Sequence, residues 1–450
     1  MLRALVLLLA AIVATTGVCS AQLTSIDSID RELQRKADAG QFSGSVLVAK
    51  ERRVLLNKGY GRATYPAGTP NSDATRFRIG SLTKQFTAAA ILELRDQGKL
   101  SLDDAVCRYV QPCPETWRMV RLSHLLSHTS GIPSYTALPE YNDIKAHAVT
   151  TAALLGLIEP LALRFAPGSA FDYGDSGYAI LGAVIERVSG LPYPTFLRAK
   201  ILDPLDMADS GCGELAASST SAQGYLAAAD GLRLAPPVDA SAAFSSGGMY
   251  STTRDLLRWA RGLMDGRVLS ERSRQEMFAS GLEDFGFGWI VPKHATPVTY
   301  LHFGELAGFE SAIFVLPDLR VAAIVLSNVE GTDVQPVVAD VAIAGAYAEY
   351  EGRYALPDLK KTLHVFVKGG TLRAQIARGP PLTLDYVSGD AFVALRGTES
   401  EVQLEFSRDD SGQVVGVQAE QFGRRFSGTR EPLPGTSATK GSAQVKWAVH

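Results

Sequence analysis

Residues 78–94 read Arg78-Ile79-Gly80-Ser81-Leu82-Thr83-Lys84-Gln85-Phe86-Thr87-Ala88-Ala89-Ala90-Ile91-Leu92-Glu93-Leu94. A short β-type run ends at Gly80, whose backbone can turn sharply, and the Ala- and Leu-rich residues that follow favour a helix beginning at or just after Ser81. Positions three apart on a helix are neighbours, so the Lys84 ammonium can reach the Ser81 hydroxyl. The pattern therefore brings a nucleophile and a base together at the start of a helix.

The first turn of a helix suits this chemistry. A serine hydroxyl attacks a carbonyl poorly unless a neighbour takes its proton and its developing negative charge is stabilised. The free N–H groups there favour an anion and disfavour a cation by about 0.3–1 kcal/mol, so a purely structural Lys84 gains nothing. The alternative is an N-cap serine beside a solvated lysine. The same spacing recurs at Ser437 and Lys440, in a Pro/Gly/Ser/Thr-rich tail, so spacing alone is not specific.

The composition is that of an ordinary globular chain. With 450 residues, of which 46% are hydrophobic and 20% charged, the chain can form one large domain and a smaller one. A net charge of −3 leaves no basic surplus that could neutralise phosphates. We therefore expect a small-molecule or peptide substrate and no nucleic-acid partner.

The N-terminus predicts a secretory signal over residues 1–21. It combines the charged start Met1-Leu2-Arg3, an apolar run over residues 4–18 and small residues before position 22. Removal of this segment would leave an exported chain, periplasmic or secreted, with no transmembrane span. Cys19 raises a lipoprotein alternative, which Val18 before it disfavours.

Two cysteines of the mature chain are close in sequence. Cys107 and Cys113 could form a disulfide in an oxidising compartment, which would leave one cysteine over. Two buried free thiols are the alternative.

Two histidines have the spacing of a metal site. His124 and His128 are four apart on an expected helix, but Leu125 stands where a zinc protease carries glutamate. We predict neither a metal nor a cofactor.

Periodicity divides the chain into two domains. Alternating segments over residues 351–432 predict a small all-β barrel or sandwich, after a larger domain over residues 22–350 and before a flexible tail over residues 433–450. The larger domain is expected to contain a helix over 23–40, a β-hairpin over 44–60, strands at 287–291, 299–302, 311–315 and 321–326, and a helix over 334–350.

Four motifs occur in one order along the larger domain. They are Ser81-Leu82-Thr83-Lys84, Leu126-Ser127-His128-Thr129-Ser130-Gly131-Ile132, Tyr173-Gly174-Asp175 and His302-Phe303-Gly304. Together they resemble the serine hydrolases related to class C β-lactamases and D-alanyl-D-alanine carboxypeptidases, over about residues 40–345. The resemblance implies an α/β fold of the α+β type, in which helices flank an antiparallel sheet and an all-helical lobe lies on one side. The C-terminal β domain resembles the lipocalin-like extensions of some of these hydrolases; it would shape the cleft, bind a partner or only cover a sheet edge.

The resemblance also implies catalytic roles. Ser81 would form an acyl-enzyme with a small amide or ester, and Lys84 and Tyr173 would share the proton transfers. Both side chains act as bases near neutral pH only if their pKa values are lowered, and each can lower the other's. The backbone N–H groups of Ser81 and Glu305 would form the oxyanion hole.

Two residues depart from the family pattern. The loop triplet often ends in asparagine, whereas Asp175 can accept hydrogen bonds but cannot donate one when ionised. True β-lactamases carry Lys-Thr-Gly as third motif, whereas His302 is charged only below its pKa, near 6.5 when unperturbed. With Asp175, His302 and Gly304 as substrate-binding residues, we expect a peptidase- or esterase-like enzyme rather than an efficient β-lactamase. Asp175 also motivates an alternative, a catalytically inactive relative that binds peptidoglycan-like ligands.

Overall fold

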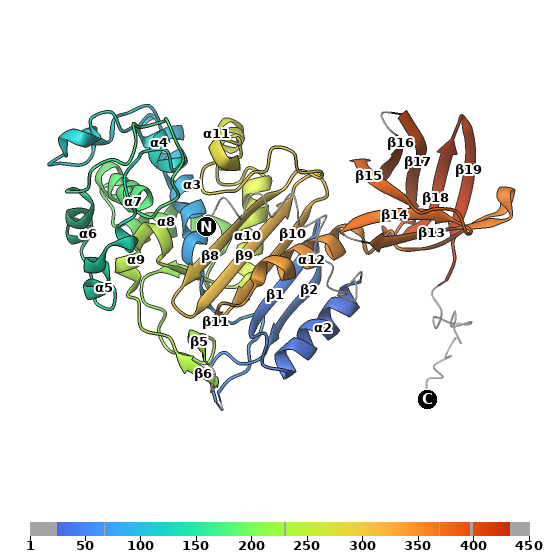
Figure 1. The fold of residues 1–450 in the computed structure, drawn as a ribbon, viewed down its shortest axis with the longest axis horizontal. Helices are drawn as coiled ribbons and strands as arrows, with labels where there is room; N and C mark the ends of the chain where they lie inside the picture. The colour runs from blue at the N-terminus through green and yellow to red at the C-terminus, as the bar shows by residue number, and fades with distance from the viewer. Residues whose placement is uncertain (1–24, 67, 229–230, 369, 397–398, 433–450) are drawn as a thin grey trace, which may run out of the picture. The chain divides into compact units, whose positions relative to one another are not determined.

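The computed structural model describes residues 25–432 apart from 67, 229–230, 369 and 397–398 (Figure 1). The predicted signal segment, with Cys19, and the predicted tail lie outside the described residues. The chain divides after Ala348 into two compact units.

An antiparallel five-stranded sheet forms the centre of the first unit, in the order β2-β1-β10-β9-β8. Its strands are β1 (Gly44–Lys50), β2 (Arg53–Tyr60), β8 (Tyr300–Leu306), β9 (Phe309–Leu316) and β10 (Val321–Ser327). The predicted hairpin is confirmed, with Leu47 opposite Asn57, and so is the pairing of β9 with β10, with Ile313 opposite Ile324. Nearly every residue of β1 and β10 is buried, so both faces of the sheet are covered.

Helices cover both faces of this sheet. Helices α2 (Ile26–Asp38) and α12 (Val334–Tyr347) pack together on one face, and α10 (Thr253–Met264) packs against β1 and β10. In Figure 1, α12 crosses in front of the sheet and α10 lies behind it. Ile29 and Leu33 are buried on α2, as the period of its apolar residues requires.

A helical lobe lies beside the sheet (Figure 1). Its helices are α3 (Thr83–Asp96), α4 (Leu122–Leu126), α5 (Pro139–Ile144), α6 (Thr151–Ile158), α7 (Ser176–Ser189), α8 (Tyr193–Leu197), α9 (Ala240–Gly247) and α11 (Glu271–Met277). Helix α3 packs against α7 and α9 and is buried along almost its whole length. Two small sheets complete the unit, β3 (Phe77–Arg78) with β7 (Met249–Ser251) and β4 (Gly211–Cys212), and β11 (Val329–Glu330) with β5 (Tyr225–Ala228) and β6 (Gly231–Leu234).

Three predicted elements differ in the structure. The expected strand over 287–291 is wrong, because this segment makes only isolated bridges through Ile290. Gly288 there has a φ of +73°, and a Cβ atom on it would lie 2.9 Å from the Lys84 carbonyl oxygen, so the segment crosses α3 closely instead of extending the sheet. The helix expected through His128 ends at Leu126, and the one expected over 334–350 ends at Tyr347.

The second unit is a closed eight-stranded barrel, which confirms the predicted all-β domain. Its strands are β12 (Gly352–Leu356), β13 (Lys361–Lys368), β14 (Thr371–Ile376), β15 (Leu382–Ser388), β16 (Ala391–Arg396), β17 (Glu399–Arg408), β18 (Val414–Gln421) and β19 (Arg424–Arg430). Alternate residues such as Leu363, Val365 and Val367 are buried, so side chains fill the barrel.

Candidate active site

Ser81 lies in the single 3₁₀ turn (Gly80–Leu82) that leads into α3. Gly80 has a φ of +49°, and a Cβ atom on it would lie 2.5 Å from the Glu305 carbonyl oxygen, so this turn requires glycine. The N-cap of α3 is Leu82, which excludes the alternative of an N-cap serine. The Ser81 hydroxyl instead accepts a hydrogen bond from Lys84 Nζ over 2.9 Å.

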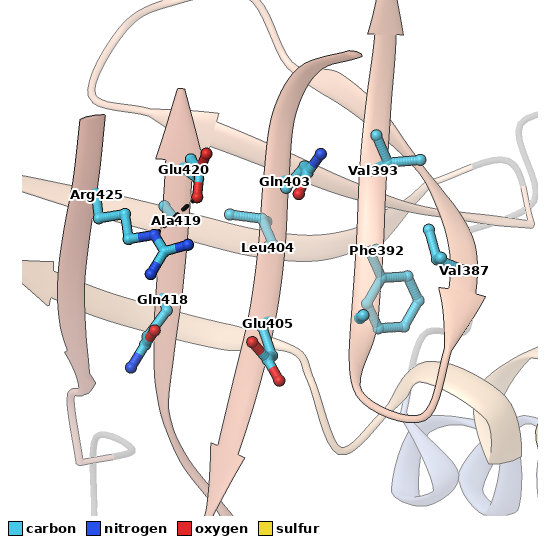
Figure 2. Close-up of a pocket in the computed structure, with 11 residues that line it drawn as sticks. Val387, Phe392, Val393, Gln403, Leu404, Glu405, Gln418, Ala419, Glu420 and Arg425 are labelled. Atoms are coloured by element: carbon cyan, nitrogen blue, oxygen red, sulfur yellow. Dashed lines mark hydrogen bonds and ion pairs between the residues drawn. The ribbon is translucent and has the colours of Figure 1, made fainter. Parts of the chain in front are cut away.

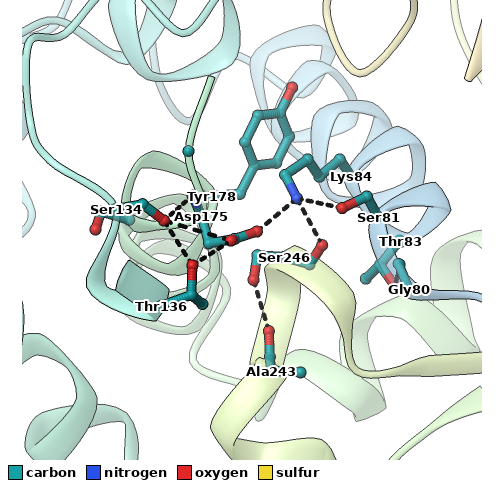
Figure 3. Close-up of polar contacts among 12 residues, drawn as sticks. Gly80, Ser81, Thr83, Lys84, Ser134, Thr136, Asp175, Tyr178, Ala243 and Ser246 are labelled. Atoms are coloured by element: carbon teal, nitrogen blue, oxygen red, sulfur yellow. Dashed lines mark hydrogen bonds and ion pairs between the residues drawn. The ribbon is translucent and has the colours of Figure 1, made fainter. Parts of the chain in front are cut away.

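Lys84 is fully buried, and Figure 3 shows three dashed contacts from its nitrogen. Nζ donates to Ser81 Oγ over 2.9 Å, to Asp175 Oδ1 over 2.7 Å and to the Ser246 carbonyl oxygen over 3.0 Å. An ammonium has three N–H donors, so each of them has an acceptor. Burial by itself would lower the pKa of Lys84, but the Asp175 carboxylate and the Tyr173 phenol outweigh it and the pKa lies above its ordinary value. The expected lowering is therefore wrong: Lys84 is a cation in this structure.

Asp175 holds Lys84 from the N-terminus of α7. Its Oδ2 accepts hydrogen bonds from Thr136 over 2.8 Å and from Ser134 over 3.4 Å, and its own N–H donates to Ser134 Oγ over 2.9 Å (Figure 3). Burial would raise the pKa of Asp175, but the Lys84 charge and the Thr136 hydroxyl keep it below its usual range. Both carboxylate oxygens of a predicted substrate-binding residue are thus bound to the protein's own side chains.

Tyr173 lies on the loop before α7, as predicted, and its side chain is partly exposed. Lys84 Nζ lies 5.0 Å from the centre of its ring and 5.8 Å from that of Tyr178. The Tyr178 hydroxyl donates to the Leu126 carbonyl oxygen over 2.9 Å, and burial raises its pKa well above the ordinary value. Tyr178 is thus bound to a backbone carbonyl in the interior, whereas Tyr173 is the partly exposed phenol of the two.

Two glycines bring the predicted oxyanion-hole groups together. A Cβ atom on Gly304 of β8 would lie 3.0 Å from the Ser81 nitrogen, and one on Gly80 would lie 2.8 Å from the Glu305 nitrogen. The backbone of β8 therefore lies directly against the turn that carries Ser81. Ser311 on the next strand, β9, stabilises this close contact, because its hydroxyl donates to the Ile79 carbonyl oxygen over 2.9 Å. The backbones of Ser81 and Glu305 are therefore close together, as a shared oxyanion hole would require.

His302 does not carry the predicted charge. The side chain is 2% exposed, and Nδ1 lies 2.6 Å from the Phe303 carbonyl oxygen, to which it must donate. Burial and, second, the Lys84 charge lower the pKa of His302 to about 3. The ring is therefore neutral at physiological pH and cannot attract a substrate carboxylate by charge, because its pKa lies far below the unperturbed value near 6.5.

Several residues at the site carried no clear motif. Ser134 and Thr136 follow the second motif by a few positions, where a cluster of hydroxyl side chains was the only signal. Ser246 contributes a backbone carbonyl, which sequence cannot reveal.

His124 and His128 accept hydrogen bonds from different backbone groups, those of Arg121 and Gly174. Within residues 25–432, as far as they are described, no group of three or more His, Cys, Asp or Glu side chains could hold a metal ion.

The cysteines lie away from this site. Cys107 and Cys113 form a disulfide, and Cys212 is a free thiol whose pKa burial raises to about 12. The described part of the chain has no helix with the length and apolar character needed to cross a bilayer.

The barrel has a pocket of about 340 Å³ on strands β15 to β19 (Figure 2). Its polar lining consists of glutamines, glutamates and Arg425, and Arg425 donates to Glu420 over 2.8 Å. Its lining contains no serine, cysteine, lysine or histidine side chain.

Comparison with known proteins decides the family. A family model described as beta-lactamase matches residues 29–348, which contain all four motifs. This chain belongs to the beta-lactamase family. A second model, a domain of unknown function called DUF3471, matches residues 342–432 of this family member.

Relatives of this beta-lactamase family member include a putative penicillin-binding protein, PbpX, of Bacillus subtilis. It is 30% identical over 64% of this chain and 71% of its own length. Two solved structures, both 24% identical, share the fold. The octameric penicillin-binding protein homologue from Pyrococcus abyssi covers 89% of this chain and 99% of its own (TM-score 0.61). The D-amino acid amidase from Ochrobactrum anthropi covers 70% and 98% (TM-score 0.63). Family membership makes the protein a serine hydrolase.

Proposed function

We propose that the protein is an exported serine hydrolase that forms an acyl-enzyme on Ser81 with a small amide or ester. The observation that carries the proposal is the contact of a fully buried Lys84 ammonium with the partly exposed Ser81 hydroxyl. An ammonium buried in this way is retained where it does chemistry or fixes structure, and here one of its three acceptors is a nucleophile. The signal-like N-terminus and the Cys107–Cys113 disulfide support export.

Because Lys84 is protonated, Tyr173 is the base in this proposal. Tyr173, as a phenolate, takes the proton of the Ser81 hydroxyl while Oγ forms a bond to the substrate carbonyl carbon. The N–H groups of Ser81 and Glu305 stabilise the resulting oxyanion. Tyr173 then gives the proton to the leaving amine or alcohol as its bond to carbon breaks, and water hydrolyses the acyl-enzyme.

We propose that substrate binding does not require the third motif to hold a carboxylate. A neutral, buried His302 gives no cation at the position where β-lactamases carry lysine. This favours amides and esters over β-lactams, and the D-amino acid amidase of the same fold is a precedent for such an activity.

Intact mass tests the proposal. The purified chain is treated with a fluorophosphonate, and a single adduct is expected on the wild type and none on Ser81→Ala. With a β-lactam we expect slower and less complete labelling. Wild-type protein that is folded yet forms no adduct with either reagent would instead favour the catalytically inactive relative that binds peptidoglycan-like ligands.

A further inference from the structure

His128, just beyond α4, is held in a costly conformation. Its backbone φ is +56°, in the left-handed region, which is unfavourable for a residue with a Cβ atom. Its side chain is 4% exposed. Nε2 is buried and has no hydrogen-bond partner among the described residues, which is also unfavourable. Unfavourable conformations and unpaired buried polar atoms of this kind are found where a functional site requires a particular geometry.

Two hydrogen bonds attach His128 to the residues on either side of Tyr173. The N–H of Asp172 donates to the His128 carbonyl oxygen over 2.9 Å. The N–H of Gly174 donates to His128 Nδ1 over 3.3 Å. The backbone of Tyr173 is therefore fixed from both sides by one residue.

The imidazole also packs directly against the phenol. The ring centres of His128 and Tyr173 are 4.4 Å apart, with an angle of 34° between the planes. Phe285 and Tyr178 contact the same imidazole, with ring centres at 4.7 Å and 5.1 Å. Aromatic contacts of this type are attractive and depend on ring geometry, so the imidazole restricts where the Tyr173 ring can lie.

The protonation state of His128 follows from its contacts. Nδ1 accepts from an N–H group and so carries no proton, which places the proton of the neutral ring on Nε2. Burial, and after it the charge of Lys84, lowers the pKa of His128 well below its usual value. A neutral imidazole beside Tyr173 leaves Lys84 as the cation that acts on the phenol.

We propose that His128 is a positioning residue, which holds the Tyr173 ring in the orientation required for proton transfer from Ser81. The inference rests on the proposed function, because Tyr173 must be the base. His128 touches no reacting atom; it acts by fixing the loop and the ring of the residue that does.

A double-mutant cycle of His128→Asn and Tyr173→Phe tests this, with hydrolysis of p-nitrophenyl acetate by the full chain as the assay. Asparagine tolerates a positive φ but removes the imidazole. We expect His128→Asn alone to lower kcat about 10–100-fold with KM within about threefold, the scale of a misplaced catalytic group. In the Tyr173→Phe background the same change is expected to cost less than about twofold, since nothing remains to be positioned.

His124→Asn is the matched control. His124 is four residues earlier, and its Nδ1 accepts from the Arg121 N–H over 3.2 Å in the same manner. It makes no hydrogen bond to the residues around Tyr173, so kcat is expected to stay within about twofold of the wild type. His128→Gln replaces His128→Asn in the cycle if the latter does not fold.

The outcomes separate the two proposals. If Tyr173→Phe alone retains the wild-type rate, the proposed base is wrong and the positioning role fails with it. If Tyr173→Phe is impaired but the His128 substitution costs the same factor in both backgrounds, or nothing in either, the base stands and only the positioning role is overturned.

Discussion

The active site and the C-terminal barrel each hold one cation surrounded by acceptors. In the barrel, the Arg408 guanidinium binds the carboxylates of Glu349 and Asp390, with closest contacts of 2.8 Å and 2.7 Å, and also the Gly412 carbonyl oxygen. Bonds to these carboxylates raise the pKa of Arg408 above its already high ordinary value. In the active site, Lys84 binds only one carboxylate, together with a carbonyl and the Ser81 hydroxyl.

The two cations differ in one acceptor, the hydroxyl group that each of them binds. The acceptors around Arg408 are two carboxylates, a carbonyl and the hydroxyl of the buried Tyr350, and together they hold the guanidinium in place. At Lys84 one acceptor is an alcohol that is partly exposed and can attack a substrate. Arg408 therefore has a structural role in the barrel. Lys84, which binds a reactive hydroxyl, is instead suited to a catalytic role in the first unit.

Removing the active-site cation should have the largest effect. Lys84→Ala is expected to lower turnover on the order of 10²–10⁴-fold, the scale for losing a proton-transfer group. It also leaves the Asp175 carboxylate, 23% exposed, without its cation, so the melting temperature should fall. In the double variant Lys84→Ala/Asp175→Asn the melting temperature should recover in part and turnover should not. Recovery of turnover as well would mean that Lys84 only compensates Asp175.

Removing the barrel cation should affect stability alone. Arg408→Met leaves Glu349 and Asp390 without this partner and is expected to lower the free energy of unfolding of the barrel by about 1.5–3 kcal/mol. Turnover of a small ester should stay within about twofold. Arg425→Met is the control, because Arg425 forms an exposed ion pair with Glu420, and urea unfolding should be unchanged. A large loss of turnover in Arg408→Met would erase the distinction between the two cations.

Local signals in the sequence predicted much of this site. The contact of Ser81 with Lys84 follows from helical spacing, the turn at Gly80 from its missing side chain, and the two hairpins from alternation and turn residues. The motifs also located Tyr173, because a loop before a helix is visible in composition. Each of these inferences uses residues that are close together in the chain.

The properties that sequence could not predict depend on distant residues. Asp175 is 91 positions from Lys84, and only their contact shows that the carboxylate outweighs burial and raises the pKa of the lysine. The sequence shows that His302 departs from the Lys-Thr-Gly pattern, but it does not show the burial that makes this histidine neutral, which comes from the aromatic residues packed around it, such as Phe285. The segment around Gly288 alternates like a strand, yet it crosses α3 because glycine permits that approach.

Asp175→Asn should have only a small effect on turnover at neutral pH, and it gives the sharpest test of which active-site group is the base. Asparagine removes the negative charge beside Lys84, and burial then acts with less opposition, so the pKa of Lys84 must fall. If the active form requires the Lys84 cation, as proposed, turnover near pH 7 changes only a few-fold. The alkaline side of the pH–rate profile then declines at lower pH in the variant than in the wild type.

The opposite result would assign the proton transfer to Lys84. A neutral lysine that accepts the Ser81 proton becomes more abundant as its pKa falls, so turnover near pH 7 would rise and the acidic side of the profile would move to lower pH. The two mechanisms therefore move different sides of one curve. Measuring kcat/KM for an ester from pH 5 to pH 10 in both proteins distinguishes them, because the same charge is removed and only the required form of Lys84 differs.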